Sequence, residues 1–144
     1  MLVEQILKSK ASDSVVSVKP GTLVSDAAKV LAENGIGSVV VSKDGKSADG
    51  ILSERDIVRE LAKRGPGCLS KMVDDYMTTK LVTCGRADTA DSVLERMTAG
   101  RFRHMPVVED GEMQGIITLG DVVKARLSEL AMEKDALEGM IMGH

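Results

Sequence analysis

Two aspartates, Asp56 and Asp121, stand at matching places in two similar stretches of the sequence, each three residues after a hydroxyl side chain, Ser53 or Thr118. A carboxylate in the first turn of a helix can accept hydrogen bonds from the two hydroxyls of a ribose, and the unpaired backbone N–H groups there favour anions such as phosphate. The same residue types also have a purely structural use. Ser and Thr cap helices, and an acidic residue near a helix N-terminus stabilises the helix by about 0.3–1 kcal/mol. The spacing predicts two capped helices and leaves ligand contact at these residues as the functional hypothesis.

The two stretches form an internal repeat, which decides the fold class. We call residues 15–58 the first copy and residues 81–123 the second copy. The copies match at an offset of 66 up to a turn, lose one residue there, and match at an offset of 65 afterwards. Both end in the pattern Gly-apolar-x-Ser/Thr-x-x-Asp, which begins at Gly50 and at Gly115 and which we call the closing motif.

Each copy is predicted to run in the order strand, helix, two strands and helix. Apolar residues at helical spacing predict the first helix, Asn34-Gly35 or Ala99-Gly100 are typical of its end, and an Asp-Gly turn predicts a hairpin after it. The predicted strands are 15–18, 38–42 and 50–53 in the first copy and 81–84, 104–108 and 115–118 in the second.

These elements predict an α/β (α+β) fold in which two βαββα units pack about a pseudo-two-fold axis, because one copy alone would leave a sheet face uncovered. We place the boundary between residues 68 and 69. Residues 1–68 then hold the first repeat with a short N-terminal docking helix, and residues 69–144 hold a linker turn, the second repeat and a long C-terminal helix. The Gly-Pro-Gly sequence at residues 65–67 predicts a break before a single helical turn around residues 69–76.

The element order and the duplicated closing motif resemble the cystathionine-β-synthase (CBS) domain pair, also called a Bateman module, over roughly residues 15–127. The resemblance implies a regulatory module without catalytic activity or catalytic cofactor. Such a module binds AMP, ADP, ATP, or sometimes NAD(H) or S-adenosylmethionine, in one or both of two clefts between the repeats. It also implies a partner protein that the module regulates, and a ribose contact at Asp56 and Asp121.

The copies differ most at the strand entry, by which we mean Ile36-Gly37-Ser38 in the first copy and Phe102-Arg103-His104 in the second. The resemblance implies that basic residues here point toward phosphates, and a guanidinium can grip a phosphate with two hydrogen bonds. Arg103 and His104 are therefore predicted phosphate contacts, and Arg101 joins them only if strand pairing begins early. The alternative is a solvated charge cluster that contributes little to stability.

The remaining predicted contacts concern the adenine base and one further charge. Arg55, which stands where the second copy has Gly120, either reaches a phosphate or is an exposed helix charge. Backbone groups near Ser17 and Thr83 are expected to read the adenine edge, as the resemblance implies. Predicted contacts with the adenine faces, each with ordinary core packing as its alternative, come from Ile36, Gly37, Ile51, Met105 and Ile116. Ser38 of the strand entry is a further predicted ligand-binding residue.

Composition excludes several classes of function. A net charge of −3 and a pI near 5.4 argue against broad capture of nucleic acid. Cys68 and Cys84 lack CxxC spacing, and with two histidines they give no metal set. The apolar N-terminal stretch is too short for a signal peptide or a membrane span, so we expect a cytoplasmic protein with reduced thiols.

The C-terminal helix carries apolar residues at heptad spacing: Val123, Leu127, Leu130, Leu137 and Ile141. This stripe either pairs with a second subunit, which makes the protein a homodimer, or lies along the module's own surface against Leu2, Ile6 and Leu7.

Two other classes of function remain as alternatives. A ligand-independent interaction protein would act through its dimer and its C-terminal helix. A small hydrolase or nucleotidyl transferase would use Asp56 or Asp121 with His104, but the sequence has no Walker-type loop or nucleophile motif.

Overall fold

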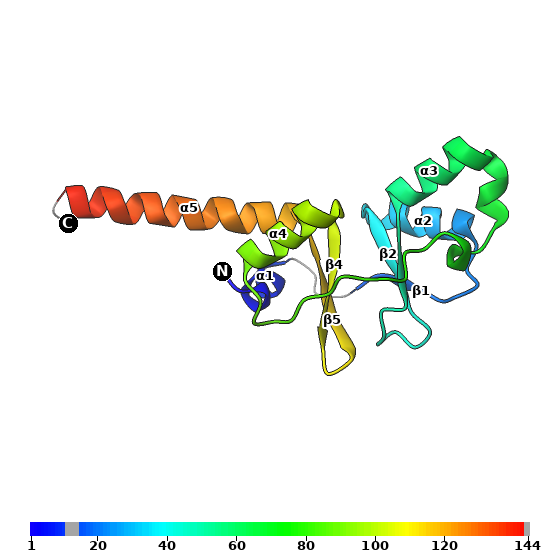
Figure 1. Ribbon diagram of the computed structural model, residues 1–144, viewed down its shortest axis with the longest axis horizontal. Coiled ribbons are helices and arrows are strands. Elements are labelled where there is room, and N and C mark those ends of the chain that lie inside the picture. Colours follow the sequence, from blue (N-terminus) through cyan, green and yellow to red (C-terminus); the bar gives the residue numbers. More distant parts are fainter. Residues whose placement is uncertain (11–14, 143–144) are drawn as a thin grey trace. The chain divides into compact units, whose positions relative to one another are not determined.

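A computed structural model describes residues 1–10 and 15–142 of the chain. Contacts divide it into two compact units (Figure 1). The described residues of one unit fall in the ranges 15–82 and 110–114, and contain the first copy. Those of the other fall in the ranges 1–10, 83–109 and 115–142, and contain the second copy apart from residues 81–82 and 110–114. The boundary predicted at residues 68 and 69 places the N-terminal helix with the first copy, whereas the contacts group this helix with the second.

The first copy forms a three-stranded sheet in the order β1 (Ser17–Val18), β2 (Ser38–Val41) and β3 (Gly50–Ser53). β1 runs parallel to β2, and β3 runs antiparallel to it as the second strand of the predicted hairpin. Every residue of β2 is buried, because β-branched valines fill the middle of the sheet. The helices α2 (Val24–Asn34) and α3 (Glu54–Arg64) contribute Val24, Ala27, Leu31 and Ile57 to the same core.

The second copy has a two-stranded sheet, made of β4 (His104–Glu109) and β5 (Glu112–Thr118). The strand predicted over residues 81–84 is reduced to one parallel bridge between Cys84 and Val107, so that prediction was wrong in extent. The helices α4 (Ala90–Gly100) and α5 (Leu119–Ile141) cover this hairpin, and Val93, Met97 and Val122 enter the core with Met105.

The predicted N-terminal helix is confirmed as α1 (Val3–Ser9), and it completes the core of the second copy. Val3, Ile6 and Leu7 are buried there among residues of α4, β5 and α5. Leu7 approaches β5 so closely that a Cβ added to Gly115 would lie 2.8 Å from its Cδ2 atom. A side chain at position 115 would therefore require Leu7 of α1 to move.

The first helix of each copy ends in a left-handed residue, as predicted, and the two residues match at the repeat offset of 66. Gly35 takes this conformation in the first copy with φ 59°. In the second copy α4 continues through Gly100, and Arg101 takes the left-handed conformation with φ 56°. The ring of Phe102 packs against the bare Cα of Gly100, where a Cβ would lie 2.4 Å from a ring carbon. A side chain at position 100 would therefore collide with the Phe102 ring unless the ring moved.

The linker forms two short 3-10 turns, Pro66–Ser70 and Val73–Asp75, where the sequence predicts a break and one helical turn. Cys68 and Val73 are buried, and the linker backbone binds the first residue of α2: the Val24 N–H donates to the Lys71 carbonyl at 2.8 Å. The linker is thus part of the first copy's fold.

Figure 1 shows α5 extending well past α1 and α4 in the same unit. Only Val122 and Ala125 of α5 are buried, and they face the cluster that contains Ile6 and Leu7. The predicted apolar stripe is exposed, from 42% at Val123 to 84% at Ile141, so it does not lie along the module's own surface. None of the helices described in residues 1–10 and 15–142 combines the length and apolar character that crossing a bilayer requires.

Candidate functional site

The first closing motif builds a reciprocal cap at the start of α3. The Asp56 N–H donates to Ser53 Oγ at 3.1 Å, and the Ser53 N–H donates to Asp56 Oδ2 at 2.9 Å. Such a box satisfies two backbone donors that a helix start would otherwise leave unpaired. The predicted cap is confirmed, and the short Asp side chain fills the place that Glu usually takes.

The second closing motif repeats this geometry at the start of α5. The Asp121 N–H donates to Thr118 Oγ1 at 3.1 Å, and the Thr118 N–H donates to Asp121 Oδ2 at 2.9 Å. The matching distances show that the duplicated spacing gives the same local hydrogen bonds in both copies.

One backbone hydrogen bond in each copy ties the strand entry to the capped helix. The Glu54 N–H donates to the Gly37 carbonyl at 2.9 Å, and the Leu119 N–H donates to the Arg103 carbonyl at 2.8 Å. In addition, Ser38 pairs directly with Ser53 across β2 and β3. The strand entry, the cap hydroxyl and the aspartate of each copy therefore lie next to one another, as the sequence repeat suggests.

The two aspartates differ in the cation that neutralises them. Asp56 is paired within its own helix, where Arg59 Nη2 lies 2.8 Å from Oδ1. Asp121 is paired with Lys10, which precedes the whole second copy and whose Nζ lies 2.8 Å from Oδ2. Lys10 Nζ also donates to the Ile116 carbonyl at 2.9 Å. The Asp56–Arg59 pair can be predicted from the sequence, because the two residues are three positions apart on a helix. The Lys10–Asp121 pair cannot be predicted in this way.

Asp121 is held in its ionised form. Partial burial raises the pKa of its carboxyl, but the hydrogen bonds from Lys10 and from the Thr118 backbone, together with the positive charge of Lys10, outweigh this. The net effect is a pKa below the ordinary value, so the carboxylate is an acceptor at neutral pH.

The predicted phosphate contacts lie around the strand entry of the second copy. Arg103 is exposed and His104 is half-buried as the first residue of β4. Arg101 is exposed and belongs to the end of α4, since its N–H donates to the Met97 carbonyl, so the early pairing that its prediction needs does not occur. In the first copy, Arg55 is exposed in the first turn of α3.

The predicted adenine contacts divide between core and accessible positions. Met105 is completely buried in the core of the second copy. For this residue the structure therefore favours core packing over contact with adenine. Ile51 is almost buried, and its backbone exchanges two hydrogen bonds with Thr78, at 2.9 and 3.0 Å. Ile36 and Ile116 are half-buried, and the carbonyl of Ile116 accepts the Lys10 bond already described.

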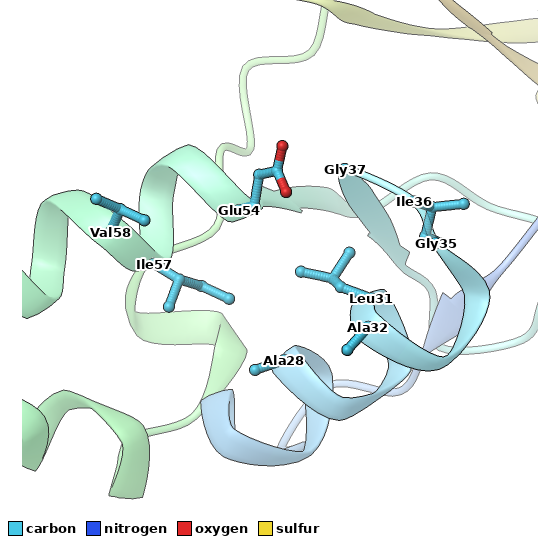
Figure 2. A pocket seen from close by; sticks show the side chains of 9 residues that line it. All are labelled: Ala28, Leu31, Ala32, Gly35, Ile36, Gly37, Glu54, Ile57 and Val58. Carbon is cyan, nitrogen blue, oxygen red and sulfur yellow. The ribbon is translucent and has the colours of Figure 1, made fainter.

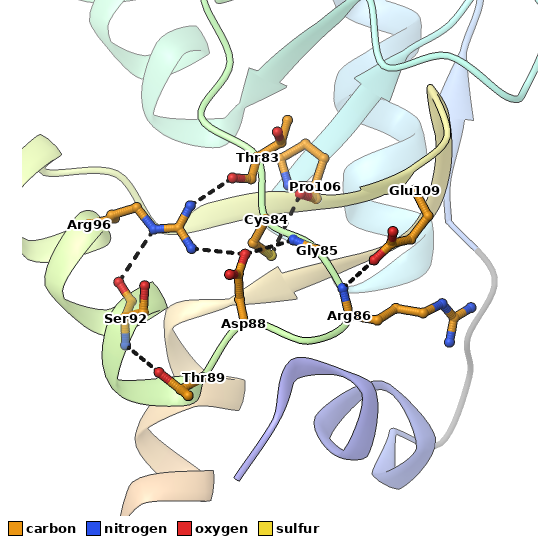
Figure 3. A network of polar contacts seen from close by, with 10 residues as sticks. All are labelled: Thr83, Cys84, Gly85, Arg86, Asp88, Thr89, Ser92, Arg96, Pro106 and Glu109. Carbon is orange, nitrogen blue, oxygen red and sulfur yellow. Dashed lines mark hydrogen bonds and ion pairs between the residues drawn. The ribbon is translucent and has the colours of Figure 1, made fainter.

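The backbone positions predicted to read adenine are not equivalent in the two copies. Ser17 lies in β1, the edge strand of its sheet. The carbonyl of Thr83 instead accepts a hydrogen bond from Arg96 Nη1 at 2.8 Å (Figure 3). Arg96 also binds the Asp88 carboxylate at 3.2 Å, so a ligand at Thr83 would compete with a fixed guanidinium.

A groove of about 470 Å³ opens between α2 and α3 (Figure 2). Nine residues line it: Ala28, Leu31, Ala32, Gly35, Ile36, Gly37, Glu54, Ile57 and Val58. Two predicted site residues, Ile36 and Gly37, are among them, whereas Ser53 and Asp56 are not. The corresponding residues of the second copy include Leu94, Phe102 and Leu119, which are bulkier or more apolar than Ala28, Ile36 and Glu54 and pack onto the core of their own unit.

Among the described residues, no three His, Cys, Asp or Glu side chains gather in a way that could hold a metal ion.

Family comparison agrees with this geometry. The model of the CBS domain matches the chain twice, over residues 3–63 and 73–128. The chain belongs to the CBS domain family. A mitochondrial CBS domain-containing protein of Arabidopsis thaliana, CBSX3, is 33% identical over 148 residues, which cover 98% of this chain and 72% of that protein.

Solved CBS proteins share the fold. A CBS-domain containing protein of Agrobacterium tumefaciens, ATU1752, is 42% identical with a TM-score of 0.84, over 88% of this chain and 99% of that one. The protein PAE2072 of Pyrobaculum aerophilum, whose structure contains AMP, is 26% identical with a TM-score of 0.77, over 92% of this chain and 99% of that one. The predicted resemblance and the predicted tandem repeat fold are confirmed.

Proposed function

We propose that this CBS protein is a regulatory module that binds an adenosyl ligand and passes the state of its sites to a partner protein, without catalysing a reaction. The observation that carries the proposal is the duplicated cluster of strand entry, cap hydroxyl and aspartate. In both copies an ionisable carboxylate stands beside a helix start and an open strand end, which suits a ribose diol next to a phosphate. The AMP found in the Pyrobaculum relative supports an adenosyl ligand.

The ligand class follows from the chemistry of the cluster. The carboxylate accepts from ribose hydroxyls, and Arg103 and His104 of the second copy supply donors for phosphate. AMP, ADP, ATP and NAD(H) share these two features. The first copy has no basic residue at its strand entry, so we expect its site to bind phosphate more weakly than the second.

Isothermal titration of the full chain with AMP, ATP and NADH tests the proposal. We expect saturable binding of at least one of them, and weaker binding after Asp121→Asn or Asp56→Asn. Asp26→Asn is the matched control, because Asp26 is also in a helix first turn but is exposed and lies outside both closing motifs. A correctly folded chain that binds none of the three nucleotides would refute the function.

The output of the module is proposed to pass through a homodimer in the cytoplasm. The exposed stripe on α5 supports self-association, since Leu127, Leu130 and Leu137 are 49–63% exposed and lie on one helix at heptad spacing. The cytoplasmic compartment is an expectation only, and the Arabidopsis relative is mitochondrial. Ligand binding would shift the packing of the units and so the surface that a partner meets.

The same stripe favours a second candidate function, a ligand-independent interaction protein. Partner binding that survives Asp56→Ala and Asp121→Ala together, but is lost when the chain is shortened after Leu127, would support this alternative over nucleotide sensing. Partner binding that changes with AMP and is lost in the double variant would support sensing.

A further inference from the structure

Lys10 reaches the aspartate of the second closing motif from outside the repeat. Its Nζ lies 2.8 Å from Asp121 Oδ2 and 2.9 Å from the Ile116 carbonyl, and both side chains of the ion pair are 23% exposed. An ammonium has three N–H donors, of which these contacts use two. The Thr118 N–H also binds Oδ2, so neither of these donors occupies Asp121 Oδ1.

The first copy neutralises its aspartate in a weaker way. Arg59 is 50% exposed and binds Asp56 from one turn further along the same helix. Arg59 also lies 3.8 Å from Glu60 Oε1, so its charge is shared between two carboxylates, whereas the Asp56 side chain itself is only 12% exposed. Lys10 is less exposed than Arg59, and its second acceptor, the Ile116 carbonyl, holds the ammonium in place. The second copy therefore has a built-in positive charge at the carboxylate proposed to bind ribose.

We propose that Lys10 determines the charge of the ligand that the second copy accepts, and that it favours adenosyl ligands with a phosphate over those with a cationic 5′ group. This inference rests on the proposed function, because it assumes that Asp121 binds the ribose. It adds a residue that belongs to neither copy and to no part of the closing motif.

The reasoning is electrostatic. A ribose bound to the Asp121 carboxylate carries its 5′ substituent only a few bonds away, so an uncompensated carboxylate would repel a phosphate there and attract a sulfonium. Lys10 cancels the carboxylate charge, and its remaining N–H can donate to a ligand oxygen. Removing the ammonium should weaken AMP binding about threefold to tenfold and strengthen S-adenosylmethionine binding by a similar factor, which is the size of a partly exposed charge contact.

The test compares Lys10→Met with three probes of different charge at the 5′ position: AMP, adenosine and S-adenosylmethionine. Affinities are measured by isothermal titration at low salt, on the full chain. We expect Lys10→Met to weaken AMP, to change adenosine less than twofold and to strengthen S-adenosylmethionine. Lys10→Arg should retain the wild-type preference because it keeps the charge.

Lys8→Met is the matched control on the same segment, because Lys8 is 73% exposed and pairs with Glu4 at 3.7 Å, away from Asp121. It should leave all three affinities unchanged. Equal changes for all three probes in Lys10→Met, or the same shift in Lys8→Met, would overturn the role of Lys10 while leaving nucleotide binding intact. Absence of binding by the wild-type chain would overturn the proposed function itself. Thermal unfolding of Lys10→Met and Lys10→Arg shows whether each variant is folded, and Lys10→Gln offers a second neutral side chain if Lys10→Met is not.

Discussion

Replacing Gly115 by alanine tests the packing of α1 on β5. The new Cβ would lie 2.8 Å from Leu7 Cδ2 and 3.6 Å from Cδ1, whereas carbon atoms in contact prefer about 3.5–4.0 Å. Leu7 must therefore move or change rotamer inside a core where it is only 6% exposed. Overpacking of this kind costs about 1–3 kcal/mol.

The net change is smaller, because a Gly to Ala change also restricts the unfolded chain. That restriction stabilises the folded protein by about 0.4–1 kcal/mol, which leaves a net loss of roughly 1–2 kcal/mol. For a chain of 144 residues this lowers the midpoint of thermal unfolding by roughly 3–8 °C. The assay is urea and thermal denaturation followed by circular dichroism, without nucleotide.

Two further variants separate the contact with Leu7 from general effects of the substitution. Gly139→Ala lies in α5 with no atom near the added Cβ, so it should stabilise the protein by about 0.5–1 kcal/mol, as alanine does in a helix. Leu7→Ala alone should cost about 2–5 kcal/mol. In that background Gly115→Ala should lose its cost, since the atoms that clash are gone. If Gly115→Ala costs the same with and without Leu7, α1 does not pack on β5 as described.

Two other predictions concern the second copy. Burial raises the pKa of the Cys84 thiol to about 11, whereas an unfolded thiol ionises near pH 8.5, so the stabilising contribution is complete below pH 8.5 and is lost as the pH rises toward 11. Urea unfolding should show a loss on the order of 2–3 kcal/mol over that interval that is absent in Cys84→Ala, and parallel pH profiles for the two proteins would contradict it. Thr118→Ala removes the oxygen that caps α5 and should cost about 1 kcal/mol in the free energy of unfolding, while Thr118→Ser should cost much less. Equal stabilities of the alanine and serine variants would show that the hydroxyl does not cap the helix.

Local spacing predicted what local hydrogen bonds determine. The caps at Ser53 and Thr118 follow from residues three positions apart, because the donors and acceptors of a helix start lie within one turn. The same applies to the hairpins, whose Asp-Gly turns place glycine at a positive φ, 77° at both Gly45 and Gly111. Repetition made these predictions stronger than any one motif alone.

Contacts between segments that are distant along the chain could not be predicted from the sequence. Lys10 and Asp121 are 111 positions apart, and nothing near either residue indicates the other. The hydrogen bond from Arg96 to the Thr83 carbonyl was not predicted either, because the pattern of side chains does not indicate which backbone carbonyls accept hydrogen bonds. The left-handed residue at Arg101 was missed because the prediction relied on the glycine at position 100, whereas the conformation falls at the repeat position of Gly35.

The position of α1 has a consequence for the order in which the protein can fold. The elements that bury Val3, Ile6 and Leu7 begin at residue 83, so the loop that must close contains the entire first copy. Closing such a loop is entropically costly unless the intervening chain has already become compact. The first copy, whose contacts are mostly local, is therefore expected to fold early and shorten the span, and the second copy is completed last. Cutting the protein between its repeats would leave the second half with an open apolar face and Asp121 without its lysine, so the two halves are not separable folding units.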